Sequence, residues 1–174
     1  MAEQRSYTGE HIYVGVDVHK STYTVTCVCQ RQIVKTATVP AEPARFAESL
    51  SRWFPGAILS SAYEAGFSGF VLHRALTTAG ITNLVVNPAS VAVAANDRVK
   101  TDRRDSKRLA IDLADSRLRG ISIPTEAEAR ARLLPRTRAP MVAHRATMTR
   151  QIKAKLHQFG LMPPGSQRLM RSRY

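Results

Sequence analysis

Apolar and polar positions in the first half of the chain follow a two-residue period in some stretches and a helical period in others. Residues 12–18 and 22–29 are rich in Val, Thr and Tyr and flank the polar sequence His-Lys-Ser-Thr, which predicts two strands joined by a tight turn. Residues 33–39 continue the strand pattern and are closed by Pro40. The chain therefore opens with three strands in hairpin order.

Helical and strand patterns alternate after these three strands. Phe46, Leu50 and Trp53 lie at i, i+4 and i+7, which predicts a helix over 43–53. The pattern continues with a strand over 58–64, a helix over 68–79 and a strand over 83–87. Three hairpin strands followed by two strand-helix-strand crossovers predict an α/β fold, with a mixed five-stranded sheet and flanking helices. This order of elements resembles that of the RNase H-like (RuvC-like) architecture.

The second half of the chain has only helical patterns. Leucines at helical spacing predict a helix over 103–119. A basic helical segment follows, from Thr125 toward Phe159, with interruptions expected at Pro135 and Pro140. It carries too few apolar residues to be buried alone, so we expect it to pair with another helix or to lie on nucleic acid.

These patterns divide the chain into three parts. We expect an α/β domain over 11–120, a basic, coiled-coil-like connector over 121–160 and a flexible tail over 161–174. The length of 174 residues suits one ordinary domain with a short appendage.

Charge separates the two halves of the chain. Residues 1–99 hold 8 Lys and Arg against 7 Asp and Glu, whereas residues 100–174 hold 18 against 6. The formal charge of +13 therefore comes almost entirely from the second half. A positive field of this size attracts polyanions, so nucleic acid is the expected partner and an anionic membrane surface is the alternative.

The sequence predicts a cytoplasmic protein. No stretch approaches the roughly 20 apolar residues of a membrane span, and residues 1–10 lack the apolar core of a signal peptide. Cys27 and Cys29 have no second pair, so they form neither a zinc half-site nor a disulfide framework.

The run Arg-Val-Lys-Thr-Asp-Arg-Arg-Asp-Ser-Lys-Arg at 98–108 places two aspartates among six basic residues. One interpretation is structural: Asp102 is a helix N-cap and Asp105 completes a capping box. The other is that both carboxylates project from one helical face and hold a divalent metal against a phosphate. The predicted nucleic-acid-binding residues are Lys20, Arg98, Lys100, Arg103, Arg104, Lys107 and Arg108.

Two further acids lie at the ends of predicted strands. Alternation places Asp17 on the face opposite Val14 and Val16, in an otherwise apolar strand. A carboxylate there is unfavourable unless it is paired, capped or metal-bound. The structural alternative is an Asx-type hydrogen bond that caps the next turn. Glu64 ends the fourth strand, where a lone glutamate is usually just solvated. In such a sheet, however, that end can neighbour the end of the first strand.

We therefore expect four carboxylates to converge as catalytic and metal-binding residues: Asp17, Glu64, Asp102 and Asp105. Such a cluster repels itself without a cation, and its hard oxygen ligands suit Mg²⁺ or Mn²⁺. Two such ions would promote chemistry at a phosphodiester. His19 is a weaker candidate, because a histidine in a turn is more often structural.

Four motifs together resemble a known family. They are Gly-Val-Asp-Val-His-Lys-Ser at 15–21, Tyr-Glu-Ala-Gly at 63–66, Asn-Pro at 87–88 and Lys-Thr-Asp-Arg-Arg-Asp-Ser-Lys-Arg-Leu-Ala at 100–110. In this order they resemble the N-terminal RuvC-like, four-acid (DEDD) catalytic domain of the insertion sequence 110 family of transposases, over about residues 11–120. The resemblance implies that the family's metal-binding acids are Asp17, Glu64, Asp102 and Asp105.

The basic segment at about 125–160 is similar to that family's coiled-coil connector, which implies a homo-oligomer formed through it. In the family a C-terminal domain carries a serine nucleophile, and a structured guide (bridge) RNA connects donor and target DNA. This chain ends before such a domain, so we expect a truncated transposase, either a natural truncation or a fragment of a longer protein, that binds DNA and RNA and lacks full activity.

The predicted function is thus Mg²⁺-dependent chemistry on phosphodiester bonds by a DNA transposase or recombinase domain. Two alternatives stay open. One is a non-catalytic nucleic-acid-binding module, in which the acids only cap a helix and stabilise turns. The other is a Holliday-junction-resolvase-like nuclease of the same fold.

Overall fold

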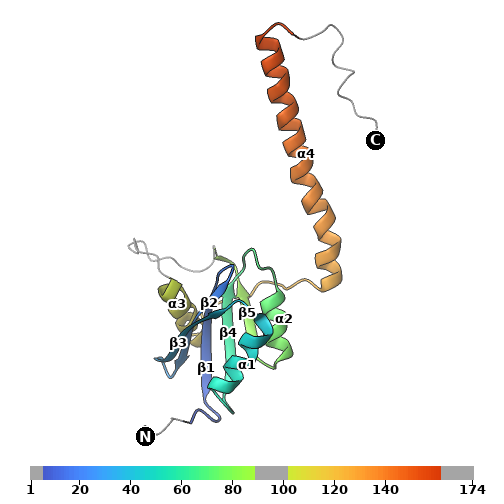
Figure 1. Cartoon of the computed structure of the whole chain (residues 1–174). Coiled ribbons are helices and arrows are strands. Elements are labelled where there is room, and N and C mark those ends of the chain that lie inside the picture. The colour runs from blue at the N-terminus through green and yellow to red at the C-terminus, as the bar shows by residue number, and fades with distance from the viewer. Residues whose placement is uncertain (1–5, 89–101, 162–174) are drawn as a thin grey trace. The chain divides into compact units, whose positions relative to one another are not determined.

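The structure is a computed structural model that describes residues 6–88 and 102–161 (Figure 1). The chain divides into two compact units, Met1–Ile123 and Pro124–Tyr174, and each is described by itself. No described helix is both long and apolar enough to cross a membrane.

The first unit is built on one five-stranded sheet. Its strands are β1 (His11–Val18), β2 (Thr22–Cys29), β3 (Gln32–Pro40), β4 (Ile58–Glu64) and β5 (Thr82–Val86), in the order β3-β2-β1-β4-β5. The pairs β1–β2 and β2–β3 are antiparallel, whereas β1–β4 and β4–β5 are parallel. This mixed sheet confirms the predicted α/β architecture, and each strand lies within one residue of its expected bounds.

Helices α1 (Pro43–Trp53) and α2 (Val71–Thr78) cover one face of the sheet (Figure 1). The core on this face contains Ile12, Val14 and Val16 of β1, Phe46 and Leu50 of α1, and Leu72 and Leu76 of α2. Helix α1 has the predicted bounds. The prediction that the second helix begins at residue 68 was wrong, because Gly66–Gly69 form a turn closed by a hydrogen bond from Gly69 N to Gly66 O at 3.2 Å.

Helix α3 (Asp102–Ala114) packs on β1, β2 and β4 from the opposite face (Figure 1). The strand β1 therefore lies between two layers of helices, which explains why it is apolar on both faces except near its end. The prediction that this helix extends to residue 119 was wrong. Ser116 has a φ of 55°, and this left-handed conformation ends the helix.

The second unit contains α4 (Glu126–Gln158), an α-helix of 33 residues. Thr125 and Glu128 form a reciprocal capping box at its start. The interruptions predicted at Pro135 and Pro140 were wrong, since the helix runs through both positions. The fixed φ of proline is compatible with a helix, and each proline removes one backbone hydrogen bond.

Candidate functional site

The ends of β1 and β4 place two carboxylates at one edge of the sheet. The parallel register pairs Val16 with Tyr63, so Asp17 and Glu64 follow at the same level on neighbouring strands. Val16 and Tyr63 are buried in the core on the α1 and α2 side. Because side chains alternate along a strand, Asp17 and Glu64 belong to the face that α3 covers. The predicted proximity of the two strand ends is confirmed.

Gly15 is the point at which α3 meets the sheet. A Cβ atom on Gly15 would lie 1.9 Å from the carbonyl oxygen of Ser106 and 2.5 Å from the backbone nitrogen of Ala110. The helix backbone thus rests directly on the strand, two residues before Asp17. The sequence analysis did not identify this role, although a glycine inside a strand is the signal expected where another backbone approaches closely.

A buried hydrogen bond fixes the first half of α3. The hydroxyl groups of Thr26 on β2 and Ser106 are 2.8 Å apart, and Ser106 is fully buried. Ser106 directly follows Asp105, which is half-buried. This contact and the close approach at Gly15 therefore determine the depth at which Asp105 is held beside the sheet.

Arg108 extends from α3 toward the end of β4. Its Nη2 atom lies 3.7 Å from Oε1 of Glu64, and the side chains are 30% and 34% exposed. Arg108 comes three residues after Asp105, so the helix places both residues on neighbouring positions of one face. A cation on α3 thus offsets the charge of a carboxylate that the sequence predicts to bind metal.

Asp17 has a different partner. Its Oδ2 atom lies 3.1 Å from Nε2 of His19, with both side chains partly exposed. The turn after β1 is closed through the backbone, by a hydrogen bond from His19 N to Thr22 O at 2.9 Å. His19 therefore contacts a predicted site residue directly.

The convergence of all four acids stays a prediction. Within residues 6–88 and 103–161, no group of three or more His, Cys, Asp or Glu side chains lies close enough to hold a metal ion. Asp102 is the first residue of α3, and its side chain lies outside the described part of the chain. The described carboxylates supply oxygen ligands, the donor type that suits Mg²⁺.

The predicted nucleic-acid-binding residues are mostly exposed. Exposed side chains belong to Lys20, Arg103, Arg104 and Lys107, while Arg108 is half-buried beside Glu64. Arg98 and Lys100 lie outside the described residues. The basic residues of α3 therefore lie in the same first two turns of the helix as Asp102 and Asp105.

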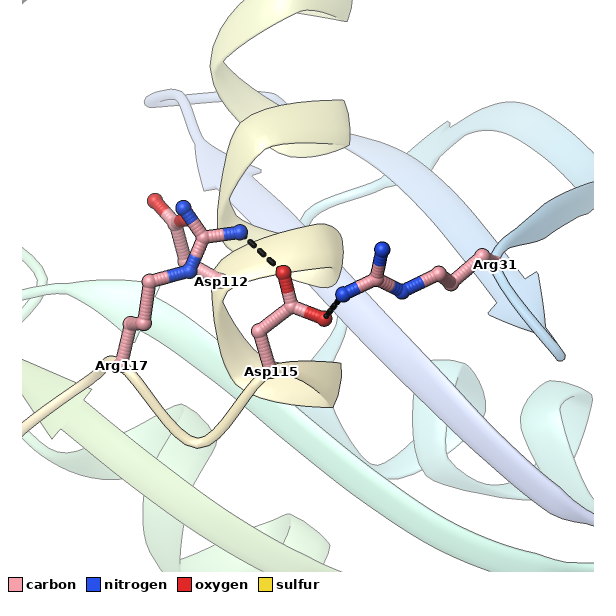
Figure 2. Close-up of polar contacts among 4 residues, drawn as sticks. All are labelled: Arg31, Asp112, Asp115 and Arg117. Atoms are coloured by element: carbon pink, nitrogen blue, oxygen red, sulfur yellow. Dashed lines mark hydrogen bonds and ion pairs between the residues drawn. The ribbon is translucent and has the colours of Figure 1, made fainter.

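An ion-pair cluster holds the end of α3 to the sheet (Figure 2). Asp115 lies between two guanidinium groups: Arg31 donates a hydrogen bond to it at 2.6 Å, and Arg117 also bonds to it. The bond from Arg117 is the main cause of the lowered pKa of Asp115. Arg31 belongs to the turn between β2 and β3 and has a φ of 64°. This cluster therefore joins α3 to the outer strands, away from Glu64.

A series of hydrogen-bonded polar side chains links β4, β5 and α2. The Oγ atom of Ser61 donates to Oδ1 of Asn83 at 2.8 Å, and the amide nitrogen of Asn83 lies 2.9 Å from Nδ1 of His73. An amide nitrogen can only donate, so Nδ1 of His73 accepts. Burial lowers the pKa of His73, and the neighbouring Arg74 lowers it further. This chain of bonds supports the strand that ends in Glu64.

Comparison with known proteins gives a consistent result. A family model described as a transposase, of the DEDD type found in insertion sequence 110, matches residues 14–160. The chain is 28% identical to the "Transposase for insertion sequence element IS1533" of Leptospira borgpetersenii, over 57% of this chain and 30% of that protein.

Two proteins of Sinorhizobium fredii are also similar to the chain. It is 35% identical to "Putative transposase y4qE" over 59% of this chain and 26% of that protein. It is 28% identical to "Putative transposase y4rJ" over 93% of this chain and 45% of that protein. The chain thus spans less than half the length of each of these relatives.

Proposed function

The chain belongs to the insertion sequence 110 family of transposases, and we propose that its first unit acts on DNA phosphodiester bonds with the help of Mg²⁺ or Mn²⁺. The observation that supports this proposal is the arrangement of Asp17 and Glu64, which lie at the same level on parallel strands beneath α3. The topology brings to one sheet edge acids that are 47 residues apart in sequence.

Four acids would hold the metal: Asp17, Glu64, Asp102 and Asp105. When bound, the metal supplies Lewis-acid stabilisation of charge on the oxygens of a phosphodiester. The protein's own contribution is orientation. The contacts of α3 at Gly15 and Thr26 hold Asp105 in place, and parallel pairing holds Asp17 beside Glu64.

The basic residues around α3 would hold the nucleic-acid backbone. Exposed Arg103, Arg104 and Lys107 occupy the turns that also carry Asp105. Phosphate contacts from such side chains position a strand without reading its sequence. DNA is the partner proposed from family membership, and a structured guide RNA is a further proposed partner.

We also propose that α4 mediates self-association, as the resemblance implies. Leu134, Met141 and Met148 are spaced seven residues apart and are 78%, 67% and 45% exposed. Ile152 follows Met148 by four residues, Phe159 follows Ile152 by seven, and both are also exposed. Apolar residues repeated every seven positions are typical of a helix that pairs with another helix. Analytical ultracentrifugation of the Met141→Lys variant tests this, since a charge among these exposed apolar residues should shift the chain toward monomer.

The decisive experiment is metal-dependent cleavage of branched DNA. Wild type should cleave with Mg²⁺ and not with EDTA, and Asp17→Ala should lose this activity. The matched control is Glu48→Ala, an exposed acid on α1 on the other face of the sheet. Equal cleavage by wild type and Asp17→Ala would contradict the catalytic proposal.

A second measurement does not depend on the DNA substrate. Ligand binding to the native state raises the unfolding midpoint, so Mg²⁺ should raise the Tm of wild type and of Glu48→Ala. Asp17→Ala should show a smaller rise.

A non-catalytic nucleic-acid-binding module is the second proposed function. It is favoured by the side-chain partners that two of the acids have, His19 for Asp17 and Arg108 for Glu64. It requires salt-sensitive binding that is unchanged by EDTA, together with a Tm that Mg²⁺ does not raise.

A further inference from the structure

The turn after β4 carries an exposed aromatic residue three positions after Glu64 of the candidate site. Phe67 is the second residue of the turn Gly66–Gly69 and is 73% exposed. It follows Glu64 by three positions. Single exposed apolar residues are common on protein surfaces, so the exposure alone carries no conclusion. The hydrogen bonds that hold this turn and its position after Glu64 are what distinguish Phe67.

Hydrogen bonds at three places hold the turn. Gly69 N donates to Gly66 O at 3.2 Å, and the fully buried Tyr63 donates its hydroxyl hydrogen to Gly69 O at 3.3 Å. Ala65 N donates to Val86 O at 2.8 Å, which ties the start of the turn to β5. Gly69 has a φ of 61°, a conformation that glycine adopts without strain. The ring therefore projects from a fixed base.

From this geometry we propose that Phe67 stacks on an unpaired nucleobase of the strand bound at the candidate site. The inference rests on the proposed function, because it takes nucleic acid to be the ligand at Glu64. Three peptide links limit the Cα separation of Glu64 and Phe67 to about 11 Å. One base step rises about 3.4 Å per strand, so the ring can reach a base within roughly three nucleotides of the phosphate.

The charges near Phe67 match this ligand. The guanidinium of Arg108 lies at Glu64, and α3 carries exposed Arg104 and Lys107. A combination of cations for the backbone and an aromatic face for a base is typical of single-strand binding, and stacking tolerates any base. Phe67 would thus fix the position of a nucleotide while the basic side chains of α3 hold phosphates.

The test is binding of a labelled single-stranded oligodeoxythymidine to the 174-residue chain, measured by fluorescence anisotropy. We expect Phe67→Ala to bind about tenfold more weakly than wild type. Phe67→Tyr should restore the affinity, because it keeps an aromatic face. The salt dependence should be the same for all three proteins, since stacking releases no counterions from phosphate. The matched control is Ile58→Ala, a 52% exposed residue at the other end of β4, which should bind like wild type.

A probe with the same backbone and abasic sites separates stacking from other effects. Wild type should lose affinity on this probe, and Phe67→Ala should bind it as weakly as wild type does. Equal affinity of wild type and Phe67→Ala for the intact strand would overturn the inference. The inference would also be overturned if Phe67→Ala lost the same affinity, relative to wild type, on the intact and the abasic probe. A third contrary result is a lower mass of Phe67→Ala in ultracentrifugation with unchanged binding, which would indicate a role in self-association.

Failure of the proposed function has a different signature. If wild type shows neither salt-dependent binding to the oligonucleotide nor metal-dependent cleavage of branched DNA, the proposed function fails and the inference about Phe67 fails with it. If wild type binds and Phe67→Ala binds equally, only the inference about Phe67 fails.

Discussion

The guanidinium of Arg108 on α3 lies 3.7 Å from the carboxylate of Glu64 on β4. The two residues are far apart in sequence and come from elements that meet only because α3 packs across the sheet. Each side chain is about one-third exposed, so solvent weakens the attraction and its contribution to stability is below about 1 kcal/mol. We therefore expect the Arg108–Glu64 pair to affect ligand binding more than the free energy of unfolding.

Replacing Arg108 with Gln should affect two ligands in opposite directions. The half-saturating concentration of Mg²⁺ in thermal unfolding should fall, because a cation beside Glu64 no longer repels the metal. Affinity for DNA, in contrast, should decrease, and the magnitude of the slope of log K against log salt should fall by about one, which corresponds to one lost phosphate contact. The same change at Arg52, an exposed residue on α1, is the control. Unchanged values for both ligands in Arg108→Gln would show that the residue does not act at the site.

The Gly15→Ala substitution should destabilise the first unit by about 3 kcal/mol. The added methyl group would lie 1.9 Å from the carbonyl oxygen of Ser106, and both contacting atoms belong to backbone. Helix α3 would have to move away from β1. Urea unfolding followed by circular dichroism measures the change. The control is Gly66→Ala, whose Cβ would have no neighbour closer than 3.9 Å; equal stability of the two variants would contradict the close packing of α3.

The stability of the first unit should depend on pH through His73. Burial lowers its pKa below the ordinary value of 6.5, so the unfolded chain binds this proton more readily than the folded chain. The stabilisation is fully present above pH 6.5 and is lost as the pH falls through the lowered pKa. Protonation would also remove the acceptor that Nδ1 offers to Asn83.

The measurement for His73 is the Tm of wild type and His73→Gln between the acid range and neutral pH. The Tm difference between the two proteins should shrink as the solution is acidified. A difference that is constant with pH would exclude His73 as the titrating group.

Replacing both Pro135 and Pro140 with Ala should stabilise α4. Each proline inside a helix is less favourable than alanine by about 3 kcal/mol, and no residue of α4 is buried in a way that would offset this. The ellipticity at the helical minimum should therefore persist to higher temperature in the double variant. The control is Ala139→Ser, which lies between the prolines and changes helix propensity only slightly. A lower melting temperature in the double variant would mean that the prolines are needed for the structure of α4.

Much of the fold followed from local pattern. The runs rich in Val, Thr and Tyr predicted β1 and β2, and the spacing of Phe46 and Leu50 predicted α1, because that helix has one consistent buried face. Helix ends were predicted less well. Helix α3 ends at Ala114 because Ser116 adopts a left-handed conformation. The continuity of α4 depends on how well a helix tolerates Pro135 and Pro140. Neither property follows from the periodicity of the sequence.

The sequence by itself determined the order of the elements and the location of the positive charge, because composition and period are local properties of the chain. It supplied the four acids only as candidates. Only the tertiary structure decided which residues meet. Asp17 and Glu64 share a level through the parallel register of β1 and β4, and Arg108 reaches Glu64 because Gly15 leaves room for the backbone of α3. Such contacts depend on the packing of segments that are distant in sequence, and no local pattern encodes the distance between them.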